Sequence, residues 1–180
     1  MGGISVAYDP LWAPWRLGYI LGDKNKTAGP YDADALLPGA DPTCFFCQAV
    51  PSGDDRQRVV VQRGEHVIVL LNRYPYNNGH LLVAPKQHVA RLDELGPEAE
   101  LELSQTMTQI VGLLEKKLQP QGFNIGLNLG RAAGAGMPGH LHWHIVPRWT
   151  GDTNFMSSVA GINVIPQSLE ALLDLLTTEN

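Results

Sequence analysis

The stretch His140-Leu141-His142-Trp143-His144-Ile145-Val146 decides the fold, because polar and apolar residues alternate along it as they do in a half-buried β-strand. Successive side chains of a strand point to opposite faces, so the three histidines share one face, while Leu141, Trp143 and Ile145 share the core face. Imidazoles spaced by two residues lie about 6.6 Å apart along a strand. We therefore predict a strand, ended by the following proline, with a row of histidines on one side.

Four further segments have the pattern of strands: residues 59–61, 67–71, 80–84 and 123–129. The first two are rich in β-branched residues and flank a turn at residues 63–65. In the last of the four, every second residue from Phe123 to Leu129 is apolar, and these side chains share one face. Together with the histidine strand, these segments predict an antiparallel sheet.

One long helix is expected between the third and fourth of these segments. Pro97 suits its first turn, Pro120 ends it, and five apolar residues fall at spacings of three and four on one face: Leu103, Met107, Ile110, Leu114 and Leu118. A short helix is expected from Ser168 to Leu176, with Ser168 as N-cap. The order of elements predicts an α+β fold, in which an antiparallel sheet has one principal helix across it.

The N-terminal part of the chain has no clear periodicity. We predict that residues 1–43 form an irregular arm, whose Trp12 and Trp15 pack on the core or on a second subunit. Residues 44–180 are long enough for one domain and not for two. The expected organisation is therefore a single domain preceded by an arm.

Charge and composition exclude several classes of function. The chain has 180 residues, 13 Lys and Arg against 18 Asp and Glu, and a formal net charge of −5, which argues against a general nucleic-acid binder. No apolar stretch approaches the roughly 20 residues that span a bilayer, and no basic segment leads into a hydrophobic one at the N-terminus. We therefore expect no membrane partner, no signal peptide and a cytoplasmic location. Two cysteines are too few for a disulfide framework.

A row of three histidines on one face of a strand is rarer than a single polar residue on a solvent-exposed face. Two chemistries could use such a row. One is a metal site, since imidazole is a common metal ligand. The other is covalent catalysis, with one histidine as nucleophile and its neighbours as orienter and proton donor. Gly134, Gly136 and Gly139 precede the row, and glycine lets backbone N–H groups approach an anion closely. This context favours phosphorus chemistry.

At this point the sequence resembles the histidine triad family of nucleotide hydrolases and transferases, whose signature is His-x-His-x-His with apolar x. Residues 71–86, with Leu71-Asn72-Arg73 and Gly79-His80-Leu81, are similar to the family's nucleoside-binding segment, and Asn128-Leu129-Gly130 is similar to its Asn-x-Gly turn. Residues 147–155 resemble the branch of the fragile-histidine-triad and diadenosine-tetraphosphate-phosphorylase-like proteins. The resemblance extends from about residue 11 to about residue 175.

The resemblance implies a role for each histidine of the row. His142 is implied to be the nucleophile, which attacks the α-phosphorus of a nucleotide and forms a nucleotidyl-histidine intermediate that water or phosphate then resolves. His144 is implied to contact the leaving-group oxygen. His140 is implied to orient His142.

The resemblance also implies the substrate contacts. His80 and Asn128 are implied to line the phosphate side, and Asn72 to lie near the ribose or base. The backbone N–H groups of the glycine-rich loop, including Gly136 and Gly139, are implied to hold the non-bridging oxygens. The family often has a polar pair in this loop where this chain has Gly136-Met137, so backbone must replace those side chains.

Cys44-Phe45-Phe46-Cys47 allows three interpretations. A redox dithiol would need a helix N-terminus and a thioredoxin-like context, neither of which is evident from the sequence. The pair could also be two small buried hydrophobes. Similarity to zinc-bearing relatives implies the third, a structural zinc site made by four residues: Cys44, Cys47, His88 and His140. His140 could instead only orient His142.

The leading hypothesis is a nucleotidyl hydrolase or transferase that cleaves dinucleoside polyphosphates, such as diadenosine tetraphosphate, or nucleotide conjugates at the α-phosphate. A phosphate-dependent phosphorylase is the first alternative, and the sequence does not separate the two. Two other classes are a hydrolase with a catalytic metal on the triad and a nucleotide-binding module without activity. The resemblance also implies a homodimer.

Overall fold

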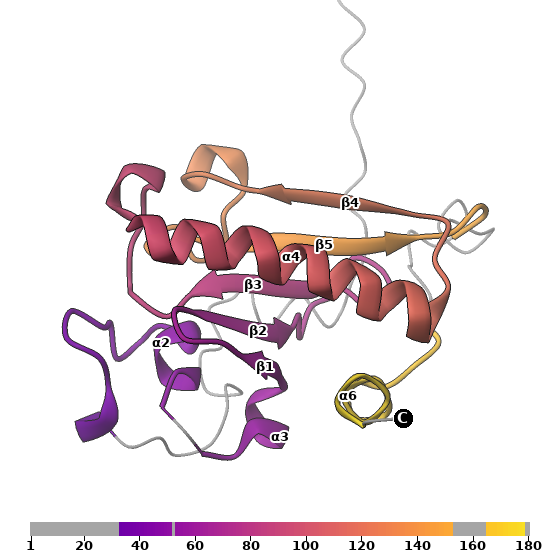
Figure 1. The fold of residues 1–180 in the computed structure, drawn as a ribbon, viewed down its shortest axis with the longest axis horizontal. Helices are drawn as coiled ribbons and strands as arrows, with labels where there is room; N and C mark the ends of the chain where they lie inside the picture. Colours follow the sequence, from indigo (N-terminus) through magenta and orange to yellow (C-terminus); the bar gives the residue numbers. More distant parts are fainter. Residues whose placement is uncertain (1–32, 52, 153–164, 179–180) are drawn as a thin grey trace, which may run out of the picture.

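The computed structural model describes residues 33–51, 53–152 and 165–178. Within these residues the chain forms a five-stranded antiparallel sheet with strand order β1-β2-β3-β5-β4 (Figure 1). The strands are β1 Val60–Arg63, β2 Val67–Leu71, β3 Leu81–Pro85, β4 Gly122–Leu127 and β5 Trp143–Arg148. The predicted α+β fold is confirmed, and the strand that carries the histidines lies between β3 and β4.

The principal helix α4, Pro97–Leu118, lies across one face of the sheet (Figure 1). Pro97 begins it, and Gln119 ends it in a left-handed conformation with a φ of 50°. The other helices and 3₁₀ turns are short: η2 Ala33–Ala35, α2 Phe45–Ala49, α3 Asp55–Arg58, η3 Leu92–Glu94, η4 Arg131–Ala133 and α6 Leu169–Thr177. Ser168 caps α6 as predicted, because its side chain accepts the N–H of Ala171.

Strands β2 and β3 are buried on both faces of the sheet, and their sequences are accordingly continuous apolar runs. On one side, alternate residues of β2, β3 and β5 pack against α4 and α6 in the larger hydrophobic cluster. On the other side, Ile68, Leu70 and Leu82 pack against α2 with its two cysteines. Leu82 pairs with His144 across β3 and β5, so the histidines share the side of the sheet covered by α2.

Two predicted strands differ from the structure. The histidine strand begins at Trp143 and continues through Pro147 to Arg148. Before Trp143 the backbone N–H of Leu141 donates to the carbonyl of Val89, outside the ladder with β4. The face of the predicted strand 123–129 expected to be apolar and covered is covered only in part: Phe123 packs against the larger hydrophobic cluster, whereas Ile125 is 48% and Leu129 49% exposed. Strand β4 ends at Leu127, and it is the edge strand of the sheet.

The loop between β2 and β3 needs a glycine immediately before His80. Gly79 has a φ of +75°, and a Cβ there would lie 2.6 Å from Leu118 Cδ1 and 3.0 Å from Pro147 Cγ. Any other residue would be strained at this φ and would have to displace the side chains of Leu118 and Pro147. The position of His80 therefore depends on this glycine.

Some predictions fall outside the described residues. These are the packing of Trp12 and Trp15 in the arm and the part of the family resemblance that lies at 153–155. In the residues that the structure does describe, no helix is long and apolar enough to cross a membrane.

Candidate active site and metal centre

His142 is held with one nitrogen fixed and the other free to react. It is 5% exposed, and its Nδ1 lies 2.8 Å from the backbone carbonyl of His140, an acceptor, so Nδ1 carries the proton. Burial lowers the pKa of His142, more strongly than the hydrogen bond to the carbonyl raises it, and the nearby His140 adds to the lowering. His142 is therefore a neutral imidazole whose Nε2 has an available lone pair, which is the state that a nucleophile needs.

A chain of hydrogen bonds fixes the tautomer of His144. The backbone N–H of Tyr76 donates to Nδ1 of His80 over 3.0 Å, so the proton of His80 is on Nε2. That Nε2 lies 2.9 Å from Nδ1 of His144 and donates to it. The remaining proton of His144 must then be on its own Nε2. This atom is buried and has no hydrogen-bond partner among the described residues.

The environment also keeps His144 neutral. Burial lowers its pKa to about 4, and the neighbouring His142 contributes to the shift. The two rings are 5.1 Å apart between centroids, at an angle of 64°. The site thus offers a lone pair on His142 and, beside it, an unpartnered N–H on His144, which together suit attack on one atom and hydrogen bonding to the group that leaves it.

Two cysteines and two histidines converge on the other side of His142. The donor atoms of Cys44, Cys47, His88 and His140 all lie within 4.8 Å of one another. Nδ1 of His140 is 3.4 Å from Cys44 Sγ and 3.6 Å from Cys47 Sγ, while Nδ1 of His88 is 3.2 Å from Cys47 Sγ. Both cysteines are free thiols and buried. These four residues could hold a metal ion in a closed Cys₂His₂ set.

Two of the four residues, His140 and Cys47, already offer a lone pair to a metal. The Nε2–H of His140 donates to the carbonyl of Pro85 over 2.8 Å, which leaves the lone pair of Nδ1 facing the sulfurs. The Cys44 thiol beside it lowers the pKa of Cys47 to about 4, so one thiolate is present, while the pKa of Cys44 is raised by Cys47 and by burial. A cation between the sulfurs would favour deprotonation of both.

His140 serves both sides. Its imidazole lies in the Cys₂His₂ set, and its backbone carbonyl accepts the Nδ1–H of His142. His140 can therefore bind a metal and orient His142 at the same time, because the two roles use different atoms of His140. Phe46 packs under both rings, with centroids 4.9 Å from His140 and 5.1 Å from His142.

The comparisons with known proteins agree with this geometry. The model of the HIT domain, named for the histidine triad, matches residues 54–151. The chain belongs to the histidine triad family. It is 39% identical over 174 residues to a protein of Mycobacterium tuberculosis named AP-4-A phosphorylase, an alignment that covers 94% of this chain and 83% of the relative.

Two solved structures of histidine triad proteins are also similar. A zinc-bound histidine triad family protein of Mycobacterium smegmatis is 28% identical with a TM-score of 0.55, over 66% of this chain and 81% of the other. A hypothetical histidine triad nucleotide-binding protein of Sulfolobus tokodaii is 27% identical with a TM-score of 0.59, over 74% and 89%. Both support the fold assigned to this histidine triad protein.

The substrate-binding residues expected from the resemblance differ in how deeply their side chains are buried. His80 is 1% exposed and lies behind His144, and the amide of Asn72 in turn contacts the His80 ring at 3.3 Å. Asn128 directly follows β4, whose last pair joins Leu127 to Trp143, so Asn128 lies beside the segment of His142. Its amide is 4.0 Å from where a Cβ of Gly134 would be.

The two glycines assigned to the phosphate loop also differ. Gly136 is exposed, as a residue that approaches a ligand would be. Gly139 lies against the Cys₂His₂ set, because a Cβ there would be 3.4 Å from Nε2 of His88.

Sequence reasoning missed two features near the cysteines. Helix α2 begins directly after Cys44, although no helix N-terminus was evident from the sequence; the helix is only five residues long. The antiparallel sheet gives no thioredoxin-like βαβ context. The packing of Phe46 on the two histidines was also missed. The available signal in the sequence was an apolar residue placed between two cysteines.

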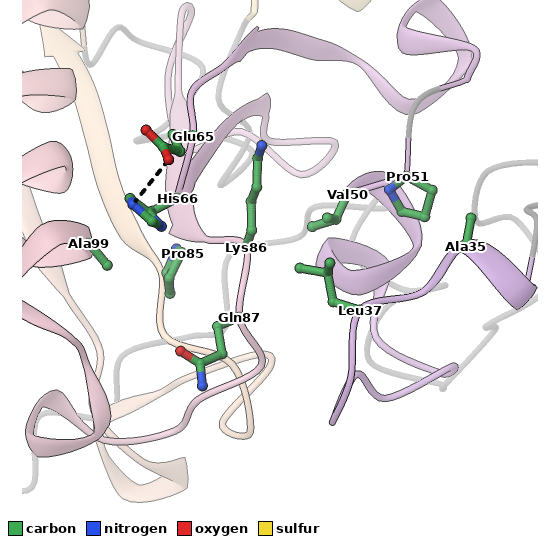
Figure 2. A pocket seen from close by; sticks show the side chains of 10 residues that line it. All are labelled: Ala35, Leu37, Val50, Pro51, Glu65, His66, Pro85, Lys86, Gln87 and Ala99. Atoms are coloured by element: carbon green, nitrogen blue, oxygen red, sulfur yellow. Dashed lines mark ion pairs between the residues drawn. The ribbon is translucent and has the colours of Figure 1, made fainter.

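Figure 2 shows the side chains that line a cavity of about 350 Å³. They are Ala35, Leu37, Val50, Pro51, Glu65, His66, Pro85, Lys86, Gln87 and Ala99. His66 has a 42% exposed side chain, and its Nε2 lies 4.0 Å from a carboxylate oxygen of Glu65. No histidine of the triad lines this cavity, so the reacting atoms are elsewhere.

Proposed function

We propose that this histidine triad protein transfers the nucleotidyl group of a dinucleoside polyphosphate, such as diadenosine tetraphosphate, through His142. The observation that carries the proposal is the free Nε2 of His142 beside the unpartnered Nε2–H of His144. Membership of the family and the similarity to AP-4-A phosphorylase support a nucleotidyl hydrolase or transferase.

The proposed reaction has two displacements at phosphorus. The lone pair of His142 Nε2 attacks the α-phosphorus, and the bond from phosphorus to the bridging oxygen breaks with its electron pair on that oxygen. His144 donates a hydrogen bond to the departing oxygen, and the His140 carbonyl stabilises the positive charge that develops on His142. An acceptor then attacks phosphorus, and the electrons of the P–N bond return to His142.

The acceptor is proposed to be inorganic phosphate, because the chain covers most of the relative named a phosphorylase. Water is the second candidate, since nothing in the described geometry selects the acceptor. Product analysis with diadenosine tetraphosphate separates them. ADP and ATP, formed only with phosphate present, indicate phosphorolysis; AMP and ATP indicate hydrolysis. An absence of turnover with either acceptor would support a binding module without activity.

The metal proposed for the Cys₂His₂ set is structural zinc. Two thiols and two imidazoles in a closed, buried set suit zinc, and a zinc-bound relative has a similar fold. When bound, zinc would hold the α2 segment against the segment that carries His142. Metal analysis of the purified protein and of His142→Asn tests this placement. Loss of metal in that variant would favour a catalytic metal on the triad instead.

We also propose a homodimer that uses the edge of the sheet at β4. Among the described residues this strand pairs with β5 alone, and Ile125 on the strand and Leu129 just after it are half-exposed. Light scattering after size-exclusion chromatography tests the proposal, with Ile125→Lys as the variant. We expect a dimer that the lysine dissociates; an unchanged mass would contradict the assignment of the interface.

The remaining proposals concern location and organisation. Buried free thiols suit a reducing compartment, which supports a cytoplasmic location. The family model lies wholly within residues 44–180, which supports a single catalytic domain with residues 1–43 as an arm.

A further inference from the structure

A tyrosine ring packs on the two imidazoles at one end of the site. Tyr76 lies in the loop between β2 and β3, and its ring centroid is 4.7 Å from that of His80. It is also 5.8 Å from the centroid of His144, with the two planes 25° apart. Because its backbone N–H fixes the tautomer of His80, Tyr76 contacts the hydrogen-bond chain through both its backbone and its ring.

Tyr76 differs from the other aromatic ring of the site in its exposure. Phe46 packs on His140 and His142 and is fully buried, so it serves as support. Tyr76 is 40% exposed, and the other large apolar side chains found exposed in the described residues are leucines and one isoleucine. A partly exposed ring beside a reacting group offers an aromatic face to a ligand, and every nucleobase has a π-face that can stack on one.

The position of the ring selects one part of the substrate. His142 takes the nucleotidyl group in the proposed reaction, whereas His144 faces the oxygen that departs. Tyr76 stacks on His144 and not on His142. Its ring therefore borders the leaving portion of the substrate.

We propose that Tyr76 is a specificity-determining residue that stacks on an aromatic ring of the leaving portion, which in a dinucleoside polyphosphate is the second nucleobase. This inference rests on the proposed function, because it takes His144 to face the departing oxygen. Tyr76 thereby favours substrates with two nucleosides over mononucleotides with the same phosphate chain.

The test compares diadenosine tetraphosphate with adenosine 5′-tetraphosphate, which has the same number of phosphates and lacks the second nucleoside. Tyr76→Ala should lower kcat/KM for the first substrate roughly ten-fold and change it for the second by no more than about two-fold. Tyr76→Phe keeps the ring and should keep both values. Leu101→Ala is the control, because Leu101 is also a large, exposed side chain, 60% exposed, and lies on α4 outside the site.

An equal loss for both substrates in Tyr76→Ala would overturn the inference, because it would mean that the ring serves only to hold the two histidines. Unchanged values for both would also overturn it. Calorimetric binding of methylene-bridged, non-cleavable analogues of the two compounds gives a readout without turnover. If neither substrate is turned over, the proposed function fails, but the binding measurement still tests the inference about Tyr76. The inference requires that the wild-type protein bind the two-nucleoside analogue more tightly than the other and that Tyr76→Ala lose this preference.

Discussion

His140 and His144 lie four residues apart and face the same side of the sheet, yet their imidazoles are in opposite situations. Both nitrogens of His140 are directed at protein groups, Nδ1 at the two sulfurs and Nε2 at the carbonyl of Pro85. His144 receives a hydrogen bond from His80 at Nδ1, and its Nε2 has no partner in the described part of the chain. A histidine whose two nitrogens both contact protein groups is suited to a structural role. A histidine with one nitrogen that has no protein partner is suited to contact a substrate.

His142 lies between them and depends on both. The backbone of His140 orients its ring, and the ring of His144 lies next to its reactive nitrogen. The comparison therefore predicts that substitutions on the His144 side remove activity and spare the metal, whereas substitutions on the His140 side remove the metal.

The largest effect is expected for His142→Asn, which removes the nucleophile. Turnover should fall by about 10⁴-fold or more, because no other group can form the covalent intermediate. Metal content and melting temperature should remain close to those of the wild-type protein, as measured by elemental analysis and thermal unfolding. Substantial residual turnover by this variant would exclude His142 as the nucleophile.

Cys47→Ser should affect the metal first. Serine is a poor zinc ligand, so bound metal should be lost, and the melting temperature should fall by roughly 5–10 °C as α2 loses its attachment. Thr43→Ala, at an exposed residue just before the metal-binding pair, is the control and should keep its metal. Full metal content in Cys47→Ser would remove this cysteine from the proposed site.

His80→Ala should lower kcat by about 100-fold through His144. The variant removes the donor that fixes the tautomer of His144, and loss of one oriented hydrogen bond to a reacting group costs about 3 kcal/mol. Metal should be retained, and His66→Ala, at a half-exposed histidine, should change neither property. Wild-type kcat in His80→Ala would show that His144 does not depend on this contact.

The smallest effect expected is on the pH profile. Because the pKa of His144 is lowered to about 4 from the ordinary 6.5, the folded protein keeps it neutral where the unfolded chain binds a proton. This contribution to stability is therefore fully present above about pH 6.5 and decreases as the pH falls toward 4. A proton on Nδ1 would also face the Nε2–H of His80, so the acid limb of kcat/KM should lie well below pH 6.5. An acid limb centred at 6.5 would contradict the buried, neutral state.

The sequence predicted the parts of the molecule that depend on periodicity. The sheet, α4 and the common face of the three histidines follow from patterns of two and of three to four residues, which local geometry enforces. The cysteines and His88 were found through the family resemblance, since the donors of a metal site are side chains whose meeting depends on the fold.

Other features depend on tertiary contacts and could not be read from a pattern. His80 reads as the first residue of a strand, and its place behind His144 arises only when β3 pairs with β5. The exposed part of β4 reads as a core face, because alternation does not reveal whether a strand is at the edge of the sheet. Tyr76 reads as one of several aromatic residues near a proline until the loop folds over the histidines.

The most direct test of the account is to trap the nucleotidyl group on the protein. Wild-type protein mixed with diadenosine tetraphosphate and quenched under alkaline conditions, which preserve a phosphorus–nitrogen bond to histidine, can be digested and examined by mass spectrometry. We predict one adenylyl group on the peptide that contains His142, formed by the wild-type protein and by Leu101→Ala, and absent in His142→Asn. Turnover with an adduct on another residue, or an adduct that persists in His142→Asn, would contradict the account.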